Sequence, residues 1–583
     1  MSGPEKKVSK VKFDKEMVIA FVLCGLLLVF WQPLCVKMGW MPDPAAAAAA
    51  APSPAAAAPA VVEQPVEKAA VAVKAAEKTA KNTQEPVISL PAVTLENKLV
   101  SCTILPETGA VTGITLKTFK TADRKQDIVV DQLPSAKTAG GALQPGALGV
   151  FLPGTPLKHL HIVSSEVSAD HRTYTLIRDA VAGTVALRIT QVWTLGDDHV
   201  LKMALTVENP SERAVVLNNL TVSGGELQGW QNVSGDVLRM DSHKLDYYLA
   251  NGSYEDVNID AKDSKFFRQA NDVQWAALSN KFFISVLKSG QPFTLYQARV
   301  LEPGSSERYF AAAGAQFNNV QLAPGKAANW DFQLYAGPKT TALKSFAPDA
   351  DRTMHLAWGP LDYLARLLLW VLIQLKGLCG SYGWSIIIMT ILVRLLFWPA
   401  TAKANASMKK MSKVQPQIQE LRAKYKDNPQ MLNTKMMELY RKEGVNPMGG
   451  CLPILLQIPV FFALYATLDG AVELRQVPFW WATDLAAPDT VAHIFGLAIN
   501  PLVLAMTLLM VVQQRLTPTA MDPMQQKMMM IMPIVMLFFL YNLPSGLTLY
   551  WTVSQIFSIL QMLLQKHHNT AASAPKADGA QKA

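Results

Sequence analysis

One charged side chain, Arg394, lies inside the apolar segment 382–400, which is long enough for a membrane helix. Inserting a guanidinium near the middle of such a helix costs about 2.5–3.5 kcal/mol, and residues of this kind usually face a wet cavity or a charged partner. Snorkelling to the membrane surface is the alternative, but the next lysine, Lys403, is nine residues away, and Trp398 and Pro399 lie between. We therefore interpret Arg394 as a functional residue.

Neutral polar residues accompany Arg394 in the apolar segments. Thr390 lies one helical turn before it, and Gln457 lies in another apolar segment. Two neighbouring polar stripes run along the last apolar segment, namely Thr548, Thr552 and Gln555, and beside them Ser554, Ser558, Gln561 and Gln565. Because such residues also hold membrane helices together, the stripes alone fit helix packing equally well. Combined with a buried arginine, they favour a water-accessible groove.

These residues do not form a catalytic or metal-binding pattern. The interiors of the apolar segments contain no Asp or Glu, and His493 lies at an edge. Intramembrane proteolysis needs paired aspartates, a Ser–His pair or a metal, and ion-coupled transport usually needs acidic residues within spans. The five cysteines are scattered and form no CxxC pair. We expect no catalytic residue, no metal and no cofactor.

Methionines crowd around Pro533, at positions Met524, Met528, Met529, Met530, Met532 and Met536. Core packing explains any single one of them. A cluster of such flexible, polarizable side chains instead suits a surface that accommodates apolar segments of many shapes. A polar groove with one positive charge and a methionine wall would fit a hydrophobic segment that carries a short acidic stretch.

The hydrophobic residues, 50% of the 583, are unevenly distributed along the chain. Several lysines precede the apolar run 17–36, which lacks small residues at cleavage spacing and therefore predicts an uncleaved membrane anchor. Most of the net charge of +9 lies in segments between apolar runs, where it reports orientation. We expect no sequence-specific nucleic-acid binding.

The most basic internal segment decides the predicted topology. Residues 403–443 hold ten Lys and Arg against four acids, so the positive-inside rule places them in the cytoplasm. Spans at both 361–378 and 382–400 would export this segment. We therefore interpret 358–378 as an amphipathic helix on the membrane surface, with its polar residues Asp362, Arg366, Gln374 and Lys376 on one face.

The predicted architecture is a polytopic α-helical membrane protein with six spans, both ends in the cytoplasm, a large exported domain and a cytoplasmic helical hairpin. The predicted segments are a basic cytoplasmic N-terminus 1–16, the first span 17–36, an Ala/Pro-rich exported linker 37–92, the exported domain 93–345, the surface helix 358–378, the second span 382–400, the hairpin 401–450, the third span 451–468, an exported loop 469–492, the fourth span 493–513, a cytoplasmic loop 514–526, the fifth span 527–542, the sixth span 546–565 and a cytoplasmic tail 566–583.

Strand patterns fill the exported domain. Apolar residues alternate with others along 185–193 and again along 201–207, which ends at the turn Asn209-Pro210. This period of two predicts an antiparallel β-sandwich. In the hairpin, Val414 and Ile418 recur at helical spacing, and Asn428 is suited to cap a second helix that begins at Pro429.

Four motifs, Asn446–Pro459, Phe461–Tyr465, Asp522–Lys527 with Met532-Pro533, and Pro544–Trp551, closely resemble those of the YidC/Oxa/Alb family of membrane-protein insertases. The resemblance covers essentially the whole chain, and the exported domain and extra first span look like the Gram-negative form. It implies a multi-pass insertase and chaperone of the bacterial inner membrane, with a periplasmic β-supersandwich. The implied partners are nascent membrane proteins, the lipid bilayer, the Sec translocon (SecYEG and SecDF) and, through the hairpin, the ribosome.

The resemblance also implies roles for individual residues. Arg394, Thr390 and Gln457 would line a groove that opens to the cytoplasm and to lipid but not to the exported side. Substrates would contact a slide made of Pro453, Pro459, Met532, Met536, Phe539, Tyr550 and Trp551.

Two other functions stay open from the residues themselves. A membrane transporter or lipid flippase would use Arg394 to bind an anionic group. Alternatively, the exported domain would be a sugar-binding or epimerising module that the spans merely anchor. A strong, saturable response to one small solute would favour either of these over insertion.

Overall fold

The computed structural model describes residues 90–121, 124–130, 146–153, 155, 157–227, 244–258, 270–301, 309–357, 359–426, 428–444, 452–495, 497–517 and 523–572. The chain divides into the units Met1–Pro86 and Val87–Ala583, and all described residues belong to the second. The predicted N-terminus 1–16, the first span 17–36 and nearly all of the linker 37–92 therefore lie outside the described residues.

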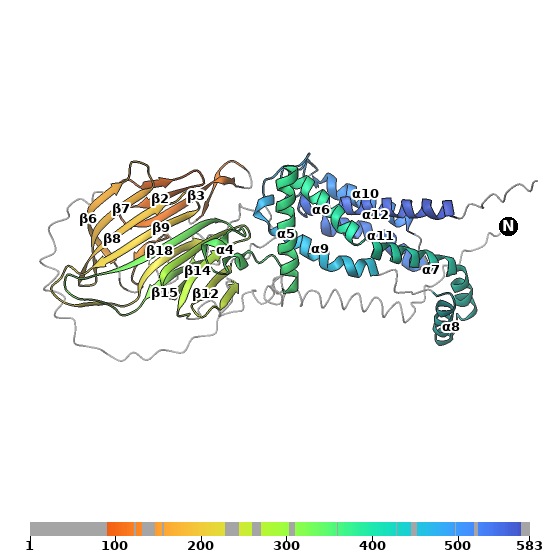
Figure 1. The fold of residues 1–583 in the computed structure, drawn as a ribbon, viewed down its shortest axis with the longest axis horizontal. Helices are drawn as coiled ribbons and strands as arrows, with labels where there is room; N and C mark the ends of the chain where they lie inside the picture. The colour runs from red at the N-terminus through yellow and green to blue at the C-terminus, as the bar shows by residue number, and fades with distance from the viewer. Residues whose placement is uncertain are drawn as a thin grey trace, which may run out of the picture. The chain divides into compact units, whose positions relative to one another are not determined.

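The first part of this unit is built from antiparallel strands (Figure 1). They are β1 (Val93–Glu96), β2 (Val100–Leu105), β3 (Ala110–Lys120), β4 (Asp127–Val130), β5 (Val150–Phe151), β6 (Leu157–Val167), β7 (Thr173–Ala182), β8 (Val185–Leu195), β9 (Val200–Glu208), β10 (Val215–Leu217), β11 (Leu220–Leu227), β12 (Lys244–Leu249), β13 (Tyr254–Asn258), β14 (Val273–Ser279), β15 (Phe283–Leu301), β16 (Tyr309–Phe317), β17 (Val320–Leu322) and β18 (Ala327–Pro338).

Alternating burial confirms the strands that the sequence predicts at 185–207. Leu187, Ile189 and Trp193 of β8 are buried, and so are Leu201, Met203, Leu205 and Val207 of β9. Their intervening neighbours point the other way because successive side chains of a strand face opposite sides of the sheet. The predicted turn after β9 is held by Asn209, whose side-chain amide donates to the carbonyl oxygens of Arg213 (2.7 Å) and Leu322 (3.1 Å).

A single twelve-stranded sheet dominates the domain. Its main path runs β13-β12-β14-β15-β18-β9-β8-β7-β6, and β16, β11 and β5 branch from it. The branch arises on β15, which pairs with β14 and β18 through residues 283–293 and with β16 through residues 294–301. The separate four-stranded sheet β1–β4 shares one hydrophobic core with β7, β8 and β9. The predicted antiparallel, β-rich domain is confirmed, with one large branched sheet in place of two similar layers.

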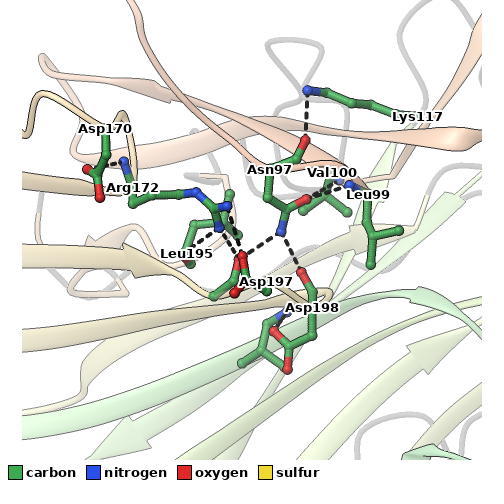
Figure 2. Close-up of polar contacts among 11 residues, drawn as sticks. Asn97, Leu99, Val100, Lys117, Asp170, Arg172, Leu195, Asp197 and Asp198 are labelled. Carbon is green, nitrogen blue, oxygen red and sulfur yellow. Dashed lines mark hydrogen bonds and ion pairs between the residues drawn. The ribbon is translucent and has the colours of Figure 1, made fainter.

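A buried asparagine joins the small sheet to the large one (Figure 2). Asn97 lies in the turn between β1 and β2, and its side-chain oxygen accepts hydrogen bonds from the backbone N–H groups of Leu99 and Val100, both at 2.7 Å. Its amide nitrogen donates to the carbonyls of Gly196 (2.8 Å) and Asp198 (2.7 Å) in the turn between β8 and β9. One side chain therefore fixes two turns about one hundred residues apart in the chain.

The segment after β18 is docked on the sheet by a second apolar cluster and a polar contact. The helix α4 (Leu343–Phe346) and the 3-10 helix η2 (Ala350–Met354) pack on Trp275, Ile284 and Val286. Just after η2, Nε2 of His355 lies 2.7 Å from Oδ1 of the fully buried Asp246, which also accepts a hydrogen bond from the Tyr254 hydroxyl. Burial alone would raise the pKa of Asp246, but His355 and Tyr254 outweigh it and hold this pKa below 3.8.

Replacing His355 with alanine is expected to lower the free energy of unfolding of this domain by about 1–3 kcal/mol at neutral pH, because a fully buried carboxylate loses a hydrogen-bonding partner. The folded-state pKa of Asp246 is depressed, so its stabilisation is present above the ordinary carboxyl pKa and is lost as the pH falls through the folded value. Urea unfolding of the detergent-solubilised chain between pH 3 and 7 would measure both effects.

His161→Ala is the matched control for this prediction. Nε2 of His161 also faces a carboxylate, that of Asp179 at 3.3 Å, but the imidazole is 64% exposed. An exposed pair of this kind contributes about 0–1 kcal/mol. Equal destabilisation by the two histidine variants, or an acid profile unchanged in His355→Ala, would contradict the assignment.

The second part of the unit is helical (Figure 1). Its elements are α5 (Pro360–Cys379), α6 (Tyr382–Leu396), α7 (Trp398–Lys424), α8 (Pro429–Lys442), α9 (Leu452–Gly470), the 3-10 helix η4 (Val472–Leu474), the hairpin strands β19 (Ala492–Ile494) and β20 (Leu497–Ile499), α10 (Pro501–Leu516), α11 (Pro523–Leu540) and α12 (Ser545–Ala572). A common hydrophobic core joins α5, α6, α9, α10 and α12.

Few of the described helices are long and apolar enough to cross a membrane by themselves. Ser545–Gln565 within α12 meets this condition, and α6 with α7 meets it as one span bent by 60°. Pro501–Leu516 and Met529–Leu540 are apolar but shorter. The number of six spans therefore stays a prediction.

Two boundaries differ from the predicted segments. Where the fourth span 493–513 is predicted, the strands β19 (Ala492–Ile494) and β20 (Leu497–Ile499) pair with each other, and α10 begins only at Pro501. Proline lacks a backbone N–H and is therefore favoured in the first turn of a helix. The bend after α6 falls at Phe397, so α7 begins at Trp398 rather than after the predicted span end at 400.

The helices α7 and α8 form the predicted hairpin around a small apolar contact. Val414 and Ile418 of α7 are buried against residues of α8, including Met436 and Leu439. The Asn428 side chain accepts a hydrogen bond from Met431 N at 3.0 Å, and Pro429 occupies the first turn. Both capping predictions are confirmed.

Candidate functional site

The Arg394 guanidinium meets a serine of the last helix. Arg394 lies in the last turn of α6, and its Nε donates to Ser554 Oγ of α12 at 2.6 Å. A second guanidinium nitrogen, Nη2, donates to the same oxygen. Ser554 is buried, and within the described part of the chain no carboxylate pairs with Arg394. The arginine therefore keeps its positive charge with a neutral partner.

A second polar contact joins α12 to α9. The Gln457 amide donates to the Tyr550 hydroxyl, and Tyr550 is buried. Because Tyr550 and Ser554 are four residues apart on α12, they lie on the same face of that helix. Arg394, Ser554, Tyr550 and Gln457 thus form a continuous line of polar side chains across α6, α12 and α9, which we call the polar line.

Thr390 lies beside this line but is satisfied within its own helix. It is fully buried, and its hydroxyl donates to the carbonyl oxygen of Ile386 at 2.6 Å. Thr552 of α12 behaves in the same way, donating to Thr548 O at 2.7 Å. These hydroxyls add polarity to the helix surfaces without joining the helices to one another.

A further polar contact lies on the same helix beyond Ser554. The Gln561 amide donates to Thr401 Oγ1 of α7 at 3.0 Å, and Ser558 donates to Ser554 O at 2.9 Å. Residues 550 to 561 of α12 therefore present polar groups toward α6, α7 and α9. Of the two polar stripes predicted on this helix, the one containing Ser554 and Gln561 makes the contacts between helices.

The predicted slide residues do not share one environment. Phe539 and Met532 of α11 are exposed, Met536 is half-buried, and Pro459 of α9 is exposed. Trp551 is half-buried and packs edge-on against Phe461, with ring centroids 5.0 Å apart. Tyr550 is buried in the polar line instead. The side chain of Pro453 lies outside the described residues.

The exposed side of α11 is apolar. Met530, Ile531, Ile534 and Phe538 are all more than half exposed. Pro533 is buried beneath them. A large exposed apolar surface indicates contact with lipid or with an apolar partner. The site thus combines a polar line that carries one positive charge with an apolar helix face.

No sequence pattern connects the two halves of this site. Ser554 was assigned to a polar stripe but not to Arg394, and Tyr550 was assigned to the slide. The place of Tyr550 in the polar line could have been predicted from the sequence. Tyr550 precedes Ser554 by one helical turn, and a buried tyrosine hydroxyl needs a hydrogen-bonding partner.

Comparisons with known proteins cover both parts of the chain. Residues 374–572 match the family profile described as 60Kd inner membrane protein, and residues 92–371 match that of the YidC periplasmic domain. The chain is 33% identical to the membrane protein insertase YidC of Pelobacter propionicus over 497 residues, which cover 82% of this chain and 88% of that protein. It is 30% identical to the insertase YidC of Aromatoleum aromaticum over 569 residues, covering 94% and 96%.

Solved structures give weaker likenesses. A crystal structure of an active YidC insertase with its first transmembrane domain resolved is 20% identical, with a TM-score of 0.34 over 82% of this chain and 92% of that one. A galactose mutarotase related enzyme from Lactobacillus acidophilus is 8% identical, with a TM-score of 0.29 over 42% of this chain and 97% of that one.

Proposed function

Since this chain belongs to the YidC family of membrane protein insertases, we propose that the polar line across α6, α9 and α12 is the path by which it moves membrane segments into the bilayer. The family consists of insertases and not of enzymes. The single observation that carries the proposal is the half-buried Arg394, whose partner Ser554 is neutral. A positive charge kept in this place attracts a carboxylate by about 1–4 kcal/mol at contact distance, depending on hydration.

The proposed mechanism uses the two surfaces in sequence. A short acidic or polar stretch of the incoming protein enters beside Arg394, where Gln457, Tyr550 and Ser554 offer hydrogen bonds. The apolar segment that follows moves along Met532, Phe539 and the rest of the exposed α11 face into lipid. Hydrogen-bonding groups lower the cost of moving polar residues out of water, and the apolar face receives the hydrophobic segment.

We propose the predicted topology as the setting for this mechanism. Both ends lie in the cytoplasm, six spans cross the inner membrane, and the β-rich domain lies in the periplasm. The basic hairpin α7–α8 then faces the cytoplasm, where it would meet the ribosome or the emerging substrate. The Sec translocon is a further proposed partner, for substrates that need a channel for long exported loops.

Reconstitution tests this function directly. Proteoliposomes that contain the purified chain would be supplied with a short single-span protein that carries an acidic exported tail. Insertion is measured as the fraction of that tail protected from added protease, with empty liposomes as the control. The proposal predicts protection well above the empty-liposome level. Protection equal to that in empty liposomes would contradict unaided insertion by this chain.

A further inference from the structure

The loop between α9 and α10 has its charged groups inside and its apolar groups outside. Asp489 is buried and accepts hydrogen bonds from Trp481 Nε1 (2.9 Å) and Leu502 N (2.7 Å). Asp484 accepts from the backbone N–H groups of Gln476 and Ala486, both at 2.8 Å. Burial raises the pKa of both carboxyl groups above 3.8. A loop that faces water normally shows the opposite arrangement.

The only arginine of this loop is also turned inward. Arg475 is buried, donates to the carbonyl oxygen of Lys120 at 2.7 Å and lies over the rings of Phe282 and Phe283. Its side chain is therefore engaged with the β-rich domain. Between residues 477 and 499, His493 is the only described ionisable side chain that is exposed.

The exposed side chains are large and apolar, and they come from two parts of the loop and from the first turn of α6. Trp480 is 63% exposed and stacks on Phe479, with ring centroids 4.8 Å apart. At the tip of the β19–β20 hairpin, Phe495 is fully exposed beside Ile494. We call the exposed set the aromatic rim; its members are Trp384, Trp480, Trp481, Val491, Ile494 and Phe495.

The rim lies at one common end of the apolar helices. Trp384 of the first turn of α6 contacts Trp480, with ring centroids 6.2 Å apart. Residues 485 and 487 accept hydrogen bonds from the first backbone N–H groups of α12, those of Gly546 and Ser545. Asn500, just before α10, donates to the carbonyl of Tyr541, which follows α11, at 2.8 Å. The loop thus connects the ends of α6, α10, α11 and α12 on the side where α9 finishes.

We propose that the aromatic rim inserts into the lipid headgroup region and anchors this end of the helical part in the membrane interface. Aromatic side chains, and tryptophan above all, concentrate at this depth of a bilayer because they are apolar with a polar edge. Apolar helices that begin and end beside the rim hold it at the membrane surface by covalent connection. Its lack of exposed Lys, Arg, Asp and Glu fits a lipid interface better than a charged protein partner.

The expected depth of the aromatic rim follows from the depth at which other interfacial elements lie in a bilayer. Amphipathic elements that lie in the interface bury their apolar face by about 5–10 Å at the headgroup/acyl boundary. The assignment of this interface to the outer leaflet rests on the proposed topology. With the rim and the β-rich domain both attached to the α9–α10 loop, the rim would fix the height of the helix ends relative to the lipid.

Site-directed spin labelling of the full chain in phospholipid vesicles tests this inference. Nitroxides would be placed at Trp480→Cys, Phe495→Cys and, as the control, Glu166→Cys, an exposed position of β6, after the native cysteines are replaced. Collision with oxygen, which concentrates in lipid, is compared with collision with a water-soluble nickel chelate. At 480 and 495 we expect oxygen collisions to exceed nickel collisions, and at 166 the reverse.

Two results would overturn the inference. Nickel accessibility at 495 equal to that at 166 would place the rim in water. Low accessibility to both reagents with an immobilised spectrum would show that protein, not lipid, covers it. Insertion activity measured on the same vesicles separates this inference from the proposed function, because vesicles that insert substrate while their rim labels lie in water would refute the rim alone.

Discussion

Replacing Arg394 with alanine is expected to reduce insertion of an acidic-tailed substrate in proteoliposomes by about tenfold or more. A contact between this charge and a carboxylate contributes about 1–4 kcal/mol, depending on hydration, and about 1.4 kcal/mol corresponds to a factor of ten in an equilibrium. Ser554 cannot replace the lost charge, and no described carboxylate is released by the substitution. The measurement is the protease-protected fraction at equal amounts of folded insertase.

Two variants distinguish the effect of the positive charge at position 394 from the effect of its contact with Ser554. Arg394→Lys keeps the positive charge but loses the two-nitrogen contact with Ser554, so it is expected to retain most of the activity. Ser554→Ala removes the same contact and one hydrogen-bonding group of the path but leaves the guanidinium, so it is expected to lose less activity than Arg394→Ala. Activity lost equally in all three variants would mean that the contact between α6 and α12 matters and the charge does not. Full activity in Arg394→Ala would make the apolar α11 face the main determinant of insertion.

Gly383→Val is expected to give the largest loss of stability in the helical part, about 1–3 kcal/mol, as for other overpacked cores. Gly383 lies in the first turn of α6 and is buried, and a Cβ at this position would overlap the Phe479 ring. That ring cannot move freely, because it is buried and contacts both Trp384 and Trp480. Displacing α6 would also shift Arg394 relative to Ser554. Thermal unfolding in detergent and the insertion assay would both report the change.

Gly377→Ala provides the matched control. Gly377 is also a helical glycine, in α5, but it is exposed and no atom lies within 4 Å of a Cβ built there. Alanine is favoured over glycine in helices by about 1 kcal/mol, so this variant should be as stable as the parent or more so. A Gly383→Val protein that unfolds at the same temperature as Gly377→Ala would show that α6 and the Phe479 loop are not packed together in the membrane.

The β-rich domain was largely predictable because strands leave a local signal. The alternation along β8 and β9 follows from the two faces of a sheet, one of which must be buried. The branch at β15 was not predictable in this way. Its two halves pair with different strands, and that choice depends on contacts between residues far apart in the chain. The contact of His355 with Asp246 is equally non-local, since 109 residues separate them.

The candidate site, like the β-rich domain, was predictable only where the signal is local in the sequence. Arg394 could be singled out from sequence because the cost of a charge in an apolar helix depends only on its neighbours in the chain. Ser554 could not be identified as its partner, because this requires the rotation of α12 relative to α6, across 160 residues. The same information separates the buried Tyr550 from the exposed Phe539, which the family resemblance placed together on the slide.

The start of α10 was predictable but was missed. Apolar residues from 493 onward suggested a continuous span, whereas Asn500-Pro501 is a local signal for the beginning of a helix. The hairpin that precedes it carries Phe495, so this boundary decides whether residues 492–499 lie within the bilayer or at its surface.

Insertion along the polar line requires that this line border a groove that water enters from the cytoplasm. Ser558 is half-buried on α12, one turn beyond Ser554. In a background without native cysteines, Ser558→Cys would be treated with a membrane-impermeant maleimide in right-side-out and in inverted vesicles. Leu560→Cys, on the exposed apolar side of α12, controls for lipid-facing positions, and Glu166→Cys for the exported side. We expect Ser558→Cys to react in inverted vesicles only and Leu560→Cys to react in neither. If Ser558→Cys is as unreactive as Leu560→Cys, or reacts from the exported side, the hydrated cytoplasmic groove is contradicted.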